Sequence, residues 1–367
     1  MKRLVSVFLA CLICWSPLQA VSAEPMRRGL FVSVIQDPPV LNGRQSILQL
    51  VDYARQANVG ILFVQIYRAN MAWFPSTVAD MAPYKTALNN VGEDPLALLI
   101  REAHRYGIEV HAWLNLFSLA ENANAPFLKK YGLSILTTNV HPKKRLADYK
   151  IDDQYFLEPS DQRVQAALSL VQEEILRAYP SLDGIQFDYI RYPDTKPAYG
   201  YSPDNVERFR KVTGIKQFNE KTPAWQTWKR EQVTLFLKRL VRQARELRPG
   251  IHVSATGCMP YARAYYEAFQ DWPAWIDKGI VDFVTLMNYS TDLVEYQRWV
   301  GDAMGRVKDD GRVNMAIGAY KSSGPVDIFS QEFGICEKSG AGACVAFHYG
   351  SLLDNQTANQ FFVNSKR

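Results

Sequence analysis

The sequence has few of the residues and motifs that hold metal ions or cofactors. None of its five histidines belongs to an H-x-x-H or H-E-x-x-H pair, which argues against a zinc deacetylase or protease site. A G-x-S-x-G nucleophile motif is absent, and no cysteine has a convincing histidine partner in the sequence. We therefore expect neither a metal ion nor an organic cofactor.

A strong net charge is also missing. The chain has 42 basic and 37 acidic residues, a formal charge of +5. Without Lys2 and Arg3 the balance is 40 to 37, or +3. No dense Lys/Arg cluster offsets this weak balance, so we expect no binding of nucleic acid.

Long apolar runs are absent except at the start of the chain. Residues 1–23 combine a basic start, the run "LVSVFLACLICW" and small residues before Glu24, which is typical of a cleaved secretory signal peptide. An uncleaved anchor, or lipidation at Cys11, is the alternative. No later run approaches the roughly 20 residues of a spanning helix, so we expect a secreted or periplasmic protein with no transmembrane segment in its mature chain.

Only three cysteines remain beyond that segment. Cys336 and Cys344 are close in sequence and could form a disulfide in an exported protein, although two free buried thiols fit equally well. Cys258 is expected to pack rather than react.

An apolar strand pattern alternates with a helical pattern eight times. Eight parallel strands close a (β/α)₈ TIM barrel, which we expect as a single, monomeric domain over residues 27–363. A doubly wound open sheet is the rival, but no glycine-rich phosphate loop follows the first strand. Long segments at 68–93, 117–160 and 191–222 each follow a strand, on the face where barrels keep active sites. The predicted strands are residues 29–35, 61–67, 108–116, 184–190, 251–258, 281–289, 313–320 and 344–350.

The stretch "DGIQFDYIRYP" (183–193) places a carboxylate inside one of these strands. Because strand side chains alternate, Ile185 and Phe187 should face the helices while Gln186 and Asp188 face the barrel axis. Most inward polar residues could simply bond one another and fill the barrel. A carboxylate at the C-terminal end of a barrel strand, among aromatic neighbours, is instead placed for chemistry.

The remaining chemistry favours carbohydrate. The chain has 8 Trp and 19 Tyr, whose flat faces can stack on sugar rings, although core packing must account for most of them. Two carboxylates suffice to hydrolyse a glycosidic bond. A glycoside hydrolase is therefore the simplest hypothesis.

Four blocks resemble the bacterial glycosyl-hydrolase-like family 10: "VHAWLN" (110–115), "FLEPSDQRV" (156–164), "DGIQFDYIRYP" (183–193) and "DWPAWIDKGIVDFVTLMNYSTD" (271–292). The resemblance spans nearly the whole mature chain. It implies a TIM-barrel, glycosidase-like envelope protein with Asp188 as the catalytic aspartate, acting on an envelope or extracellular polysaccharide that contains amino sugars. One block departs from the family pattern, since Tyr67 stands where an Arg is usual and Arg68 follows one place later.

A second, partial resemblance is to the D-G-x-D-x-D-x-E strand of family 18 chitinases. Ile190 occupies the position of their acidic Glu, so their substrate-assisted mechanism does not transfer intact. The loss keeps an alternative open, a catalytically degenerate barrel that binds sugar without cutting it.

We predict Asp188 as nucleophile or general acid, because burial would favour the acid and a nearby Arg191 the nucleophile. Asp292, three residues after the sixth strand, is the first choice for the second carboxylate, with Asp271, Glu267 and Glu158 as alternatives. The predicted substrate contacts are Tyr67, Arg68, Trp73, His111, Trp113, Asn115, Tyr189, Arg191, Asn288, Tyr289, His348 and Tyr349.

Overall fold

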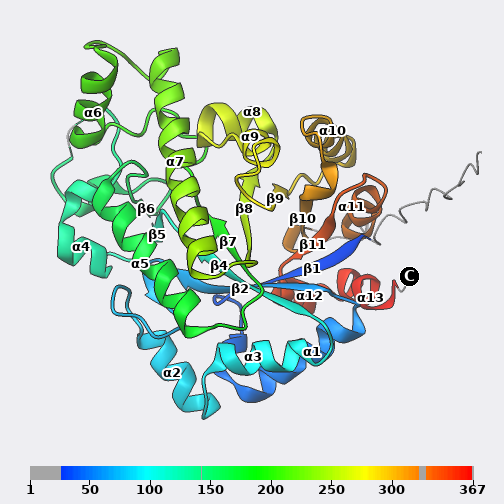
Figure 1. The fold of residues 1–367 in the computed structure, drawn as a ribbon. Helices are drawn as coiled ribbons and strands as arrows, with labels where there is room; N and C mark the ends of the chain where they lie inside the picture. The colour runs from blue at the N-terminus through cyan, green and yellow to red at the C-terminus, as the bar shows by residue number, and fades with distance from the viewer. Residues whose placement is uncertain (1–25, 142, 322–327, 366–367) are drawn as a thin grey trace, which may run out of the picture.

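Eight parallel strands form a closed barrel at the centre of the molecule (Figure 1). The computed structural model describes residues 26–141, 143–321 and 328–365, so the predicted signal peptide lies outside the described residues. Closure follows from β1, which pairs with both its sequence neighbour β2 and the last strand, β11. The (β/α)₈ prediction is confirmed. The barrel strands are β1 (Arg27–Val32), β2 (Ile61–Arg68), β4 (Glu109–Asn115), β7 (Gly184–Asp188), β8 (His252–Cys258), β9 (Phe283–Asn288), β10 (Val313–Gly318) and β11 (Ala343–Phe347).

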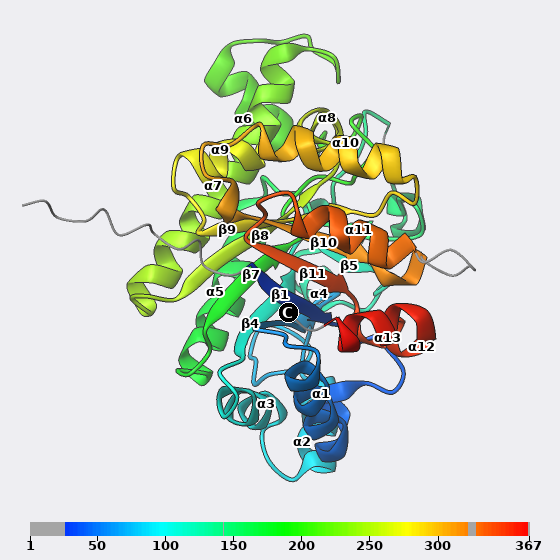
Figure 2. The same cartoon turned by 90° about the vertical axis from the view of Figure 1, so that its right-hand side faces the viewer.

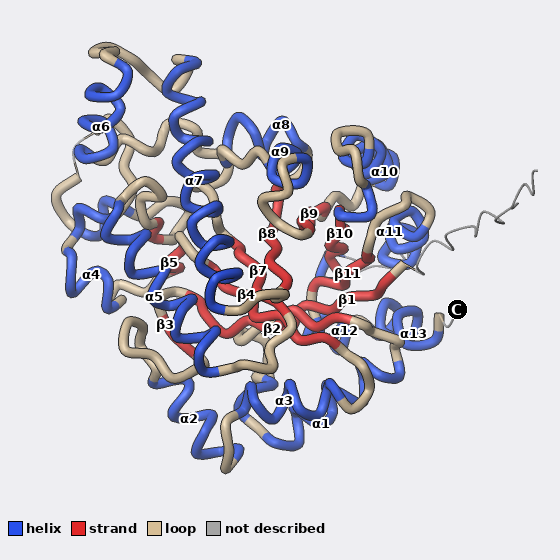
Figure 3. The backbone as a smooth tube through the Cα atoms, viewed as in Figure 1, coloured by secondary structure: helices blue, strands red, loops and turns tan. Residues whose placement is uncertain are grey.

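Helices surround the strands on the outside of the barrel (Figure 3). In the longest, α7, the buried residues Leu237, Leu240, Val241 and Ala244 recur at helical spacing and give it one apolar face. The main covering helices are α1 (Arg44–Gln56), α3 (Pro95–His104), α5 (Gln162–Ala178), α7 (Pro223–Leu247), α9 (Trp272–Asp277), α10 (Leu293–Met304), α11 (Ile328–Glu337), α12 (Tyr349–Asp354) and α13 (Gln356–Asn364).

The barrel interior is filled by aromatic residues towards its N-terminal end. Phe31, Phe63 and Trp113 belong to one buried cluster that extends from there up to the cleft, separate from the larger core between strands and helices. The His111 ring packs against Phe63 of this cluster and also lies next to Gly184. A Cβ atom at position 184 would lie 2.2 Å from that ring. Only glycine fits at that point of β7.

The three long segments predicted after strands carry extra elements. Residues 68–93 hold β3 (Met71–Ala72) and α2 (Ala82–Val91), and residues 117–160 hold α4 (Pro126–Tyr131) and the antiparallel pair β5 (Ser118–Ala120) and β6 (Tyr155–Phe156). After β7, α6 (Pro203–Thr213) packs on the start of α7 and projects from the barrel in Figures 1 and 2. Short α8 (Tyr261–Arg263) follows β8.

Two further features of the described residues concern a covalent link and the apolar length of the helices. Cys336 in α11 and Cys344 in β11 are joined by a disulfide, which resolves the choice that the sequence left open. Across residues 26–141, 143–321 and 328–365, no helix is long and apolar enough to cross a bilayer.

Candidate active site

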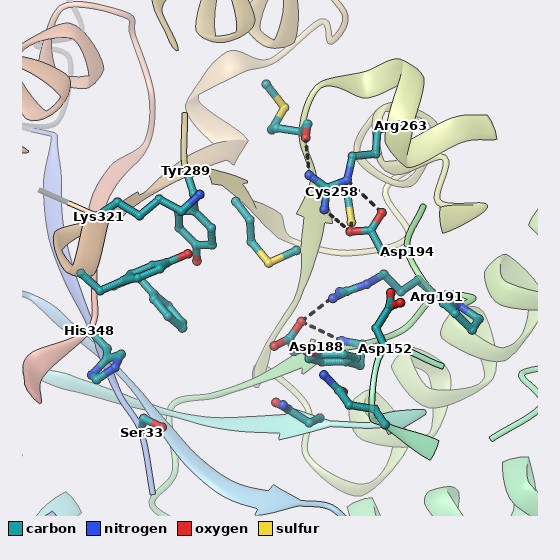
Figure 4. Close-up of a pocket in the computed structure, with 18 of the residues that line it drawn as sticks. Ser33, Asp152, Asp188, Arg191, Asp194, Cys258, Arg263, Tyr289, Lys321 and His348 are labelled. Atoms are coloured by element: carbon teal, nitrogen blue, oxygen red, sulfur yellow. Dashed lines mark hydrogen bonds and ion pairs between the residues drawn. The ribbon is translucent and has the colours of Figure 1, made fainter. Parts of the chain in front are cut away.

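A cleft of about 750 Å³ opens at the C-terminal ends of the barrel strands. Its walls come from most of the strands and from the long segments after β4 and β7 (Figure 4). Eight of the residues predicted from the sequence line it: Arg68, Trp113, Asn115, Asp188, Tyr189, Arg191, Tyr289 and His348.

Asp188 ends β7 on the floor of this cleft and is 5% exposed. Its Oδ1 accepts hydrogen bonds from the hydroxyl of Thr256 at 2.6 Å, the backbone N–H of Tyr189 at 2.7 Å and the guanidinium of Arg191 at 3.3 Å. Its Oδ2 accepts from the indole N–H of Trp113 at 3.0 Å. The buried carboxylate that the sequence singled out is thus compensated by four donors and still reaches the cleft (Figure 4).

The chain turns sharply just after Asp188. Tyr189 has a φ of 51°, a left-handed conformation that is uncommon for a residue with a side chain. The Arg191 guanidinium lies 4.1 Å from the centroid of the Tyr189 ring. Tyr192 then anchors the segment, its N–H donating to the Ala268 carbonyl at 3.1 Å and its hydroxyl to Glu158 at 2.8 Å. The "DYIRY" sequence therefore builds a rigid support around the carboxylate.

Three further carboxylates line the described part of the cleft, and sequence reasoning missed all of them: Asp152, Asp194 and Glu295. Asp194 accepts two hydrogen bonds from Arg263. Burial alone would raise the pKa of Asp194, but the bonds to Arg263 and the charge of Arg191 hold it below its ordinary value. In the sequence, the one indication that Asp194 lies near Asp188 was its position directly after "RYP".

Asp152 and Glu295 have weaker partners. Asp152 forms an ion pair with Lys196 at 3.0 Å near the rim. Glu295, in the first turn of α10, accepts from the Ser290 hydroxyl at 2.9 Å and lies 3.5 Å from Arg298. Both side chains keep substantial exposure, so either could meet a bound ligand.

The opposite wall of the cleft carries Tyr289, Lys321 and His348 (Figure 4), and the centroid of the Tyr320 ring lies 5.7 Å from that of Tyr289. Burial lowers the pKa of His348, which favours the neutral imidazole, and its Nε2 lies 3.2 Å from the Ser351 hydroxyl. On the Asp194 side, burial raises the pKa of Cys258 to about 12, so this thiol is not a nucleophile at neutral pH.

The carboxylates favoured as partners of Asp188 have other positions. Asp292 does not line the cleft, because it caps α10 by accepting from the N–H groups of Val294 and Glu295 at 2.9 and 3.0 Å. Asp271 accepts from the Tyr261 hydroxyl outside the cleft. Glu158 is fully buried behind Tyr192, and Glu267 lies on the π-helical turn Ala264–Ala268. None of the four reaches the cleft in the described structure.

Tyr67 and Trp73 also lie outside the cleft. The pairing of β2 with β4 shifts register between Gln65 and Tyr67, so side-chain alternation breaks there. Tyr67 turns into the helix-facing core, where Asn70 donates to its hydroxyl at 3.2 Å, and Arg68 takes the cleft side. Trp73 packs into the same outer core.

The other three absent residues are buried by their neighbours. His111 lies at the N-terminal end of the barrel, stacked with His252 and in edge-to-face contact with Phe63. Asn288 is fully buried and donates to the Tyr296 carbonyl at 3.2 Å. Tyr349 packs against Tyr53 of α1 with ring centroids 5.0 Å apart.

Comparison with known proteins identifies the family of this chain. The model of glycosyl hydrolase-like 10 matches residues 28–321. The chain belongs to this family. It is 24% identical over 346 residues to glycosyl hydrolase DigH of Escherichia coli (strain K12), covering 84% of this chain and 76% of that one. It is also 24% identical over 316 residues to glycosyl hydrolase YngK of Bacillus subtilis (strain 168), covering 78% of this chain and 59% of that one.

Solved structures agree on the fold. The glycoside hydrolase domain of PgaB (BpsB) from Bordetella bronchiseptica superposes with a TM-score of 0.70 at 15% identity, covering 94% of this chain and all of that domain. The catalytic domain of a β-amylase from Paenibacillus polymyxa gives a TM-score of 0.60 at 12% identity, with 93% and 97% covered. At these identities the likeness shows a shared barrel and no shared substrate.

Proposed function

We propose that this protein is an exported glycoside hydrolase that cleaves a bacterial envelope or extracellular polysaccharide containing amino sugars. One observation carries the proposal: Asp188 stands at the C-terminal end of a barrel strand, faces a large cleft and is held by four donors. Membership of a glycosyl-hydrolase-like family supports the same reaction class. The signal-peptide pattern of residues 1–23 and the disulfide support export.

The partners of Asp188 favour the role of nucleophile or charge stabiliser over that of general acid. The Trp113 indole, the Tyr189 amide and the Arg191 guanidinium can only donate hydrogen bonds. If Asp188 were protonated, the Thr256 hydroxyl would be the one partner among its four able to accept its proton. A carboxylate that only accepts suits the attack on, or the stabilisation of, an oxocarbenium-like sugar.

The general acid is then Glu295 or Asp152. Asp194 is the poorest choice, because Arg263 and Arg191 favour its charged form. Replacing the acid slows substrates with poor leaving groups more than activated aryl glycosides. We expect Glu295→Gln or Asp152→Asn to show this split, and the variant that does so identifies the acid. Equal losses on both substrate kinds in both variants would contradict this assignment.

The decisive experiment measures reducing ends released from poly-N-acetylglucosamine, galactosaminoglycan and peptidoglycan. We expect release from at least one polymer by the wild type and none by Asp188→Asn. Oligosaccharide binding without release across the whole panel would overturn the proposal and favour a barrel that only binds sugar.

A further inference from the structure

We propose that Gln65 fixes the direction of the Asn115 amide, so that the cleft presents an N–H donor beside Asp188 and selects sugars whose C2 substituent is an acetamido group. The substrate class rests on the proposed function; the direction of the amide does not. Gln65 is thus a positioning residue, and Asn115 is the residue that contacts the sugar.

The inference begins with a chain of hydrogen bonds along the cleft floor. The N–H of Ile35 donates to the Ser33 hydroxyl at 3.3 Å, and that hydroxyl lies 3.1 Å from Oε1 of Gln65. The N–H of Val34 reaches the same Oε1 at 3.3 Å. At its other end, Nε2 of Gln65 donates to Oδ1 of Asn115 at 3.1 Å.

The direction of this chain is set by groups that cannot reverse. The backbone N–H groups of Val34 and Ile35 can only donate. Ser33 accepts from Ile35, so its own hydrogen is free for Gln65, and Oε1 receives two donors. A flipped Gln65 would turn its NH₂ group towards the Val34 N–H and lose that bond. The NH₂ group of Gln65 therefore faces Asn115, and the Asn115 side chain must accept this bond with its oxygen.

Asn115 then has only its Nδ2 left for a ligand. Asn115 is 6% exposed and lines the cleft, and Nδ2 has no hydrogen-bond partner in the described part of the chain. It pairs in register with Asp188 on the neighbouring strand, and the following N–H, that of Leu116, donates to the Asp188 carbonyl at 2.9 Å. A donor thus stands next to the carboxylate that we assign to the reaction.

A donor at this place discriminates between substituents. The carbonyl oxygen of an acetamido group can accept a hydrogen bond from Nδ2. An ammonium group has only donors, so it would place N–H groups against the N–H groups of Nδ2 and form no bond. A hydroxyl group can donate or accept, so its binding does not depend on the direction of the amide, and it is a weaker acceptor than an amide carbonyl. The arrangement therefore favours N-acetylated over deacetylated amino sugars.

The test reverses the Asn115 amide by substituting Gln65, which itself lines the cleft. In Gln65→Glu one carboxylate oxygen still accepts from Ser33 and Val34, but the other accepts too. Asn115 must rotate to donate, which turns its own oxygen to the cleft. Gln65→Met removes the constraint and is the uncharged control.

The probes are the β-1,4-linked hexamers of N-acetylglucosamine and of glucose, which are both neutral and differ only at C2. We expect the wild type to bind the acetamido hexamer about tenfold more tightly, as one good hydrogen bond allows. Gln65→Glu should abolish or invert that ratio, and Gln65→Met should give an intermediate value. At low pH the introduced carboxyl group becomes protonated and can donate again, so the preference should return in Gln65→Glu alone.

Two results would overturn the inference. One is an unchanged preference in a Gln65→Glu variant that melts like the wild type; the other is a wild type that does not distinguish the hexamers. The proposed hydrolysis fails separately, on the absence of released reducing ends. Discrimination without cleavage would leave the amide assignment standing.

Discussion

The two ends of the barrel both contain buried polar residues, yet only one end is open. At the N-terminal end His111 is fully buried, with the rings of Phe63 and Phe283 centred 5.4 and 5.9 Å away. At the C-terminal end Asp188 and Asn115 are nearly as buried, but their neighbours are donors and acceptors around a cleft. Burial of a polar group therefore does not distinguish structure from function in this molecule.

The two ends of the barrel differ in the hydrogen-bond partners of their buried polar groups. The closed end fills its space with rings, and among the described residues the His111 side chain has one hydrogen-bond partner, Glu109, at 3.2 Å. At the open end four donors bind the carboxylate of Asp188, and Nδ2 of Asn115 remains available to a ligand. Substitutions at the two ends should accordingly affect different properties, activity at one and stability at the other.

The largest contrast is expected between two aspartates at opposite ends of the same strand segment. Asp188→Asn removes the charge that the reaction uses and should reduce turnover at least 10³-fold with little change in melting temperature. Asp183 accepts from the Val110 N–H at 2.7 Å and lies 2.8 Å from Nε2 of His104. Asp183→Asn should keep turnover and cost about 1 kcal/mol of stability. Reducing-end assays and thermal melts on both variants check this, and similar turnover losses in the two would refute the division.

A steric change at the closed end should come next. Gly184→Ala places a methyl group 2.2 Å from the His111 ring, and we expect a loss of about 3 kcal/mol in the free energy of unfolding. His111→Ala opens the space, so the double variant should be less destabilised than the sum of the two single changes. Urea unfolding of the three variants measures the coupling. Additive losses would show that the ring does not occupy this space.

Most of the fold was predictable because it depends on periodicity. All eight barrel strands were found near their observed bounds, since parallel strands covered by helices read as regular apolar runs. The same alternation correctly placed Asp188, Trp113 and Asn115 in the cleft. The antiparallel pair β5 and β6 was not anticipated, because each strand has only two or three residues.

The misplaced residues show where periodicity is insufficient. Tyr67 depends on a register shift between β2 and β4 that no pattern within one strand reveals. His111 was correctly placed inside the barrel, but alternation does not say at which depth the cleft ends. Asp292 follows a strand, as a catalytic residue would, yet equally precedes a helix and serves as its cap. Asp152 and Asp194 lie on loops, where spacing carries no information about direction.

The disulfide should contribute to stability without affecting the open end. Cys336 and Cys344 are separated by 8 residues and join α11 to the beginning of β11. Closing so short a loop in the unfolded chain corresponds to about 2–3 kcal/mol. We expect the double variant Cys336→Ala, Cys344→Ala to lose about this much and to keep the wild-type kcat/KM. A lost turnover at a temperature where the variant is folded would show that this link also shapes the cleft.

The smallest expected effect is the part of the pH dependence of stability that comes from His111 at the closed end. Burial lowers the pKa of His111 despite its bond to Glu109, with His252 and Asp183 as the other titratable groups nearby. The unfolded chain, whose histidines titrate near 6.5, therefore binds a proton more readily than the folded chain. The stability that depends on neutral His111 is fully present above about pH 6.5 and is lost as the pH falls through the lower, folded pKa.

His111→Phe keeps a ring against Phe63 and Phe283 but cannot titrate. Between pH 7.5 and pH 5 we expect the wild type to lose about 1 kcal/mol more unfolding free energy than this variant, measured by urea denaturation. The pH profile of kcat/KM should be the same in both proteins, because His111 does not reach the cleft. Equal pH-dependent losses in the two proteins would assign the titration to other groups, whereas a shifted activity profile would mean that the ends of the barrel are coupled.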